Sequence, residues 1–459
     1  MARIGVSRPS KWKMVVAATT VTALTLIAVA TTASAAQLKN LGHGVSAKEV
    51  KVGIAIVDYD SIADFVDFAR GDQQKTAQIF IDYINKNGGV AGGRKIKPYY
   101  KMYEPIPGRT PDPLALCTAW TDDDDVFAVL GVFIDFTGQG QLCLTKQHNT
   151  VHIGHELEQA WIDQAPPGLL LTPDTTKEAA ATNLLNILIS SGKLKGKKVG
   201  LLVDQNAEGR INDVVKPALA DAKIKTGSTA VLTITGTDTS AAQAQLDSFI
   251  EKWKSEKVDV IYIGGLTASA KQFVEKIKAA MPDVQLAADS SSVAEQAQDE
   301  VKAGKSPNPY EGIYSITGET DNERWANKGP LLQKCVDTYE KATNTKVPAP
   351  EDATVNAKGK TVQLDIAVAD FCGELMMFQT IANKVGPNLT TANWQKTVNN
   401  FGKIDLVPTK IASLCKDKYA ADDAFRLVAF DSTMGTDGDW KAVTPIKDTS
   451  GGQCTKKSS

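Results

Sequence analysis

The chain lacks the short motifs of several common enzyme classes. It has only four histidines, no CxxC pair, no GxSxG, no HExxH and no complete GxGxxG, because Gly138-Gln139-Gly140 is missing the third glycine. The 51 Lys and Arg residues nearly balance the 53 Asp and Glu residues, and no basic stripe is present, so nucleic acid is not an expected partner. With 42% hydrophobic and 23% charged residues, the composition is globular and excludes fibres and channels. A length of 459 residues predicts two domains or one bilobal unit.

The N-terminus carries an export pattern. Four basic residues precede an apolar run at 14–30, and Ala33-Ser34-Ala35 follows as a small-residue cleavage site. We therefore predict a signal peptide at 1–35, with an uncleaved membrane anchor as the alternative. No cysteine follows the cleavage site, so no lipid anchor is expected. No later stretch is apolar for long enough to cross a membrane, and we expect a secreted or periplasmic protein.

All six cysteines lie beyond this segment, and an even number in an exported chain favours disulfides. Fifteen pairings are possible. Sequence separation favours the neighbouring pairs Cys117-Cys143, Cys335-Cys372 and Cys415-Cys454. A zinc site is the weaker alternative, since only His148 lies near a cysteine in the sequence.

From residue 48 onward, short apolar runs alternate with amphipathic segments. The helix pattern of Ala77, Phe80, Ile81 and Ile84 ends at Asn87-Gly88-Gly89, and the alternation begins again after a Pro-rich break at 166–173. Strands that alternate with helices predict parallel sheets with right-handed crossovers, built twice. The predicted strands are 50–57, 96–103, 126–133, 150–153, 198–203, 230–234, 258–263, 284–288, 425–430 and 440–443, and 345–360 is a predicted surface loop.

Four segments carry a family resemblance. The turn INKNGGVAGGRKI is followed in order by DDVFAVLG, KVGLLVD and VDVIYIGG. In order and spacing these segments resemble the type I periplasmic binding proteins, specifically the leucine/isoleucine/valine-binding branch of the substrate-binding proteins of ABC transporters. The resemblance covers most of residues 48–320.

The resemblance implies two Rossmann-like α/β lobes joined by three crossings. Lobe one would comprise 36–172 and 318–404, and lobe two 173–317 and 405–459. We expect each of the three disulfides to lie within one lobe, because a bridge between lobes would resist hinge motion. The resemblance also implies a monomer without cofactor or chemistry of its own, which delivers a small molecule to an ABC transporter permease.

Parallel sheets place their binding crevice beyond the carboxyl ends of the strands. Alternative roles exist for several residues found there: Asp135 or Thr137 as a helix cap, Tyr59 and Phe136 as core aromatics, and Asp289 with its serines as a turn. The predicted ligand-binding residues are Tyr59, Asp60, Asp135, Phe136, Thr137, His155, Glu156, Gln205, Asn206, Leu266, Asp289 and Ser290.

The sequence departs from its amino-acid-binding relatives in the expected cleft. Asp135 and Phe136 stand where the resemblance implies hydroxyls, and Glu156 stands near the position of a small residue. A ligand carboxylate beside two carboxylates would be repelled. We therefore expect a cationic or polyhydroxylated solute rather than one resembling leucine.

Two other functions remain open. His152, His155, Glu156 and Glu158 form an HxxHExE cluster that could serve a secreted metal-dependent hydrolase. Alternation along a strand would place His152 and His155 on opposite faces, so we do not expect a metal there. A ligand-sensing module for a signalling partner would bind a solute equally well.

Overall fold

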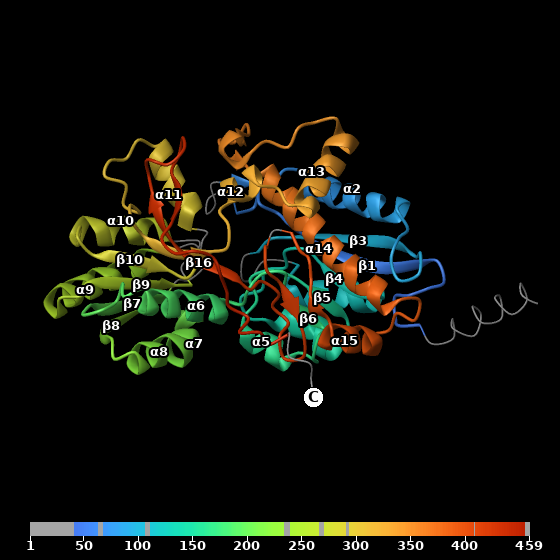
Figure 1. The fold of residues 1–459 in the computed structure, drawn as a ribbon, viewed down its shortest axis with the longest axis horizontal. Helices are drawn as coiled ribbons and strands as arrows, with labels where there is room; N and C mark the ends of the chain where they lie inside the picture. The colour runs from blue at the N-terminus through green and yellow to red at the C-terminus, as the bar shows by residue number, and fades with distance from the viewer. Residues whose placement is uncertain are drawn as a thin grey trace, which may run out of the picture.

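The computed structural model describes residues 41–62, 68–105, 111–233, 239–265, 270–290, 293–407 and 409–454. The predicted signal peptide lies outside these ranges. None of the helices in the described ranges is both long and apolar enough to cross a bilayer. The chain forms two α/β lobes, each built around its own sheet (Figure 1).

The first lobe contains a parallel sheet of five strands. In spatial order they are β3 (Lys95–Tyr103), β1 (Glu49–Val57), β4 (Ala128–Leu130), β5 (Val151–Ile153) and β6 (Leu170–Leu171). Side chains of β1 alternate between two cores: Val52 and Ile54 face one, and Ala55 and Val57 face the other. Because both faces are covered, β1 is apolar from Val52 to Val57, as is usual in parallel sheets.

Helices of the first lobe come from distant parts of the chain. One face of the sheet carries α2 (Gln73–Lys86), α13 (Pro330–Thr343), α14 (Leu364–Val385) and α15 (Thr391–Asn399), and α2, α13 and α14 lie together in Figure 1. The other face carries α3 (Pro113–Thr118), η3 (Ala119–Asp123), α4 (Gln139–Leu142) and η4 (Cys143–Gln147). The predicted turn after α2 depends on Gly89, which has φ +66°, and a Cβ there would lie 2.2 Å from the Arg94 carbonyl oxygen.

The second lobe contains a mixed sheet. Its spatial order is β17 (Asp439–Ala442), β16 (Ala424–Asp431), β11 (Tyr314–Thr317), β10 (Gln285–Ala288), β9 (Val260–Gly264), β7 (Lys198–Asp204) and β8 (Lys225–Leu232). Strands β7 to β11 are parallel, whereas β16 and β17 are antiparallel additions. The faces are covered by α6 (Lys177–Ser190) and α8 (Lys216–Asp221) on one side, and by α9 (Ser240–Glu256), α10 (Ala270–Ala280) and α11 (Val293–Lys302) on the other.

The segment at 345–360 was predicted as a surface loop, but part of it pairs with another segment. β12 (Thr354–Val355) and β13 (Thr361–Val362) form a small sheet with β2 (Phe68–Ala69). Strands of two residues give no periodicity in a sequence, so their pairing cannot be seen before the fold brings them together.

The lobes are joined by neighbouring crossings. Thr172 donates its backbone N–H to the Tyr419 carbonyl and accepts from the Ala421 N–H. Gly318, in the second crossing, lies against the third crossing at residues 421–424, since a Cβ on Gly318 would be 2.7 Å from the Ala424 carbonyl oxygen. The sequence assigned 405–459 to lobe two, yet Leu414 and other residues between 404 and 421 pack into the first core.

All three predicted cysteine pairs are confirmed. Cys117-Cys143 joins α3 to η4, and Cys335-Cys372 joins α13 to α14, both within the first lobe. The third pair, Cys415-Cys454, differs from the expectation of a bridge within one lobe. It ties a tail that arrives from the second lobe to a residue beside the first core.

Candidate functional site

The carboxyl ends of β1, β4 and β5 meet at one edge of the first sheet, where Tyr59, Val132 and His155 follow them. A small cavity of about 10 Å³ lies at this edge, roughly the space of one water molecule. Its walls also include α14, so a helix from late in the chain completes a site begun by early strands. The lining residues are Tyr59, Arg70, Gln73, Val132, Ala367, Asp370, Phe371 and Glu374.

His155 lies between two carboxylates at this site. Its Nδ1 is 2.5 Å from Asp174 Oδ2, and its Nε2 is 2.6 Å from Glu374 Oε1. Burial lowers the pKa of His155, but the two carboxylates outweigh burial and raise the pKa well above its ordinary value. The pKa of Asp174 is lowered: burial alone would raise it, but His155 outweighs burial. The histidine is therefore a fixed cation that links the strand edge, the first crossing and α14.

Helix α14 contributes carboxyl groups to an otherwise apolar segment. Burial raises the pKa of Asp365 to about 6, partly offset by Arg70, and also raises the pKa of Asp370 and Glu374. Both Asp370 and Glu374 line the cavity, and Arg70 is the one basic side chain that lines it among the described residues. The cavity wall thus holds more carboxyl groups than cations.

The second lobe contributes an arginine that contacts the segment after β5 of the first lobe. Arg210 has a side chain that is 3% exposed, and it lies 3.2 Å from Glu158 of the first lobe and 3.5 Å from Asp289 of the second. Tyr262 donates its hydroxyl to Asp289 at 2.8 Å. Burial raises the pKa of Glu158 to about 7, although Arg210 opposes that shift. Arg210 therefore joins the lobes through a buried charge pair.

Predicted residues after β1 and β4 have different surroundings. Tyr59 lines the cavity, whereas Asp60 is exposed and pairs with Lys358 at 2.9 Å. Asp135 accepts from the Thr137 N–H and hydroxyl and from the Gly140 N–H at 2.7–2.9 Å, so both of its oxygens are occupied by its own turn and the first turn of α4. Phe136 is 45% exposed. Only Tyr59 of this group lies at the cavity.

The remaining predicted residues are spread over both lobes. Glu156 has φ +58° and an exposed side chain that lies 3.6 Å from Lys177 Nζ. Gln205 and Asn206 form a 3-10 turn capped by Asp204. Ser290 follows Asp289 directly, and Leu266 lies outside the described residues.

Sequence reasoning missed much of the acidic wall. A signal was present for α14, because Asp365, Asp370 and Glu374 interrupt an apolar run, and carboxylates are rarely buried without partners. Arg70 and Arg210 gave no comparable signal, because nothing in the sequence around them differs from that around an exposed arginine. Their roles depend on contacts between segments far apart in the chain.

The HxxHExE cluster does not converge. His152 is fully buried, its Nδ1 lies 3.0 Å from the Val129 carbonyl oxygen, and burial lowers its pKa to about 4. His155 pairs with Asp174 and Glu374 instead, and Glu156 is exposed. Glu158, the fourth member, pairs with Arg210, so the four candidate ligands have different surroundings.

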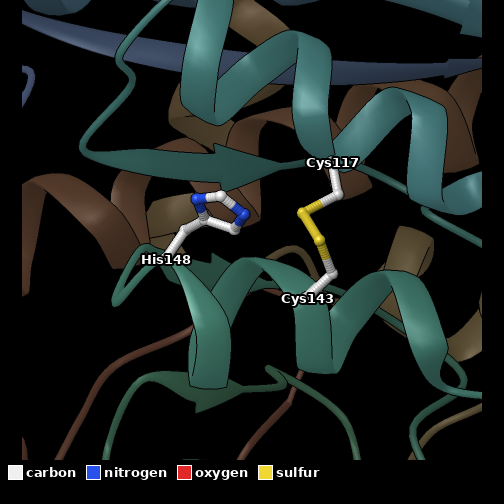
Figure 2. A group of neighbouring side chains, drawn as sticks. All are labelled: Cys117, Cys143 and His148. Atoms are coloured by element: carbon white, nitrogen blue, oxygen red, sulfur yellow. A yellow bond between two sulfur atoms is a disulfide. The ribbon is translucent and has the colours of Figure 1, made fainter.

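One other group has the composition of a metal site. Cys117, Cys143 and His148 place their ligand atoms within 4.8 Å of one another, the one group of this kind among the described residues. Figure 2 shows the two sulfurs bonded to each other. A disulfide offers no thiolate, so this group cannot bind zinc as a cysteine site does while the bridge is intact.

Comparison with known proteins agrees with this architecture. A family model described as periplasmic binding protein matches residues 66–432, and the chain belongs to that family. The resemblance found in the sequence is thereby confirmed, as is the two-lobed α/β fold with parallel sheets. No curated protein matches the sequence significantly.

Solved structures share the fold at low identity. A solute-binding protein of an ABC transporter from Rhodopseudomonas palustris BisB5, in complex with 3,4-dihydroxy benzoic acid, is 12% identical, with TM-score 0.60 over 87% of this chain and 98% of that one. A fatty acid ABC transporter substrate-binding protein from Thermomonospora curvata is 17% identical, with TM-score 0.61 over 89% and 95%. A leucine-binding protein from Thermotoga maritima is 11% identical, with TM-score 0.60 over 86% and 99%.

Proposed function

We propose that this protein is the exported solute-binding component of an ABC importer, and that it captures a small polar molecule between its lobes without chemistry of its own. The observations that carry the proposal are the cavity at the carboxyl edge of the first sheet, lined in part by α14, and the contact of Arg210 of the second lobe with Glu158, which follows β5 of that sheet. Membership of the periplasmic binding protein family supports an extracytoplasmic location and a permease partner.

The ligand class follows from the charges at the site. The relatives named above bind an aromatic acid, a fatty acid or leucine according to their names, so the fold itself does not select the ligand. Here Asp370 and Glu374 line the cavity with pKa values raised by burial. A cationic group or several hydroxyls on the ligand would donate hydrogen bonds to these carboxyls and stabilise their ionised form.

Capture by hinge closure predicts a ligand that stabilises the folded protein. A ligand at one hundred times its dissociation constant adds roughly 2.7 kcal/mol. A thermal-shift screen of amino acids, polyamines, polyols, sugars, amides and aromatic acids tests this, and we expect polyamines or polyols to raise the melting temperature. Bound stoichiometric zinc in the purified protein, with no response to any solute class, would favour the metal-dependent hydrolase instead.

Variants of two aspartates locate the ligand. Asp370→Asn should weaken a cationic ligand at least tenfold and a neutral polyol less, because only the cation loses a charge pair. Asp135→Asn is the matched control, since Asn also caps helices and Asp135 is occupied by its own turn. A larger loss of affinity for Asp135→Asn than for Asp370→Asn, measured by calorimetry, would show that the ligand binds near Asp135 and not at the cavity.

A further inference from the structure

The C-terminal tail runs back from the second lobe along the third crossing. After β17, the N–H groups of Val443 and Thr444 donate to the Leu427 carbonyl at 2.8 and 3.2 Å. The short strand β18 (Lys447–Asp448) then pairs antiparallel with the first two residues of β16. The Thr449 N–H donates to the Asp423 carbonyl at 2.8 Å. The tail therefore follows β16 from the second-lobe sheet to the place where β16 begins.

The end of this tail is fixed to the first lobe. Cys454 is disulfide-bonded to Cys415, which lies next to the core residue Leu414. The following residue, Lys416, donates its N–H to the Asn399 carbonyl at the end of α15, at 3.0 Å. The tail thus makes an additional connection between the lobes.

The crossing beneath the tail is held firmly on its first-lobe side. The side chain of Asp423 is 3% exposed and accepts from the Ser413 hydroxyl at 2.6 Å. Its other oxygen lies 3.0 Å from Lys418 Nζ. The backbone carbonyl of the same residue bonds the tail. Asp423 therefore connects the first lobe, the third crossing and the tail.

We propose that the tail, residues 443–454, is a fourth connection between the lobes, covalently closed by Cys415-Cys454, and that it limits how far the lobes separate. A hinge crossing made of a single strand opens by rotating a few backbone dihedrals. Two antiparallel strands bonded to each other at the crossing must shear or lose hydrogen bonds during the same motion. The disulfide prevents the tail from detaching from the first lobe. The tail therefore excludes the conformations in which the two lobes are farthest apart.

Two double variants separate this role from general stabilisation. Cys415→Ser/Cys454→Ser releases the tail, and Cys335→Ser/Cys372→Ser is the control within the first lobe. The sequence separations are 39 and 37 residues, so the two bridges restrict the unfolded chain almost equally. Small-angle scattering without added solute should give a larger radius of gyration for the first variant alone. Hydrogen exchange of the amides at 422–427 and 443–449 should be at least tenfold faster in that variant alone.

A further variant covers the case in which the released tail prevents folding. Four Gly and Ser residues inserted after Gly451 keep the disulfide but lengthen the tail, and the same increase in radius is expected. An unchanged radius in both tail variants, or an equal change in the control, would overturn the proposal. Because no solute is added, these outcomes are independent of the proposed transport function.

Discussion

The charge arrangement around His155 gives the most quantitative prediction. His155→Leu removes the cation between Asp174 and Glu374 while keeping side-chain volume similar. Breaking a buried ion pair by removing one partner costs about 3–5 kcal/mol. The Glu374 side chain is 2% exposed and that of Asp174 is 42% exposed, so we expect about 3 kcal/mol, the lower end, at pH 7.

The pH dependence of this loss has a defined sign. The raised pKa of His155 gives stability that is fully present below about pH 6.5 and lost as pH rises through its folded-state pKa. In the variant, Glu374 loses its cation, so its already raised pKa rises further and the carboxyl takes up a proton as pH falls. Loss of the His155 contribution alone would make the difference between wild type and variant larger at pH 5, but most of that contribution is still present at pH 7, about half a unit above 6.5. Protonation of Glu374 in the variant therefore dominates, and the difference should be smaller at pH 5 than at pH 7.

Urea unfolding at pH 5 and pH 7 measures both effects. His148→Leu is the control, because His148 and its partner Asp122 are 29% and 57% exposed, and such a pair contributes no more than about 1 kcal/mol. A loss below about 1 kcal/mol for His155→Leu at pH 7, or an equal loss at both pH values, would refute the reasoning.

Three further variants test other parts of the structure. Arg210→Met should cost about 3 kcal/mol in urea unfolding and should cost less in a Glu158→Gln background; additive effects would show that the two residues are not coupled. Asp422→Asn removes a carboxyl whose pKa is raised by burial to about 7. This carboxyl lowers the stability of the wild-type protein as pH rises from about 4 to 7. The stability of the variant should therefore depend less on pH in this range, and the variant should be more stable than wild type at pH 8. Equal pH slopes for the two proteins would contradict this. Cys117→Ser/Cys143→Ser should lose about 3.5 kcal/mol for its 26-residue separation, and an unchanged urea midpoint would show that the bridge stabilises nothing.

Much of the fold was predictable because local patterns and tertiary structure agree. The β-type run at 50–57 became a strand buried on both faces, and the turn at Asn87-Gly88-Gly89 ended α2 as expected. The tail was not predictable in the same way. Its strand β18 has two residues, and its place follows from pairing with β16 and from the disulfide at Cys454.

The candidate site was predictable only at strand ends. The rule that ligands bind beyond the carboxyl ends of parallel strands led to Tyr59, which lines the cavity, and to His155, whose partner Glu374 lines it. It could not distinguish a ligand-binding carboxylate from one that accepts hydrogen bonds within its own turn, such as Asp135, because both follow a strand. It also could not supply Glu374, which follows Tyr59 by more than 300 residues and reaches the cavity from a packed helix.

The central claim is that a solute is held between two lobes that close around it. The most direct measurement is small-angle scattering of the wild-type protein before and after saturation with a solute that raises its melting temperature. We predict a smaller radius of gyration in the saturated protein, with less change in Arg210→Met, which lacks the contact between Glu158 and the second lobe. An unchanged radius with a bound, stabilising solute would contradict capture by hinge closure.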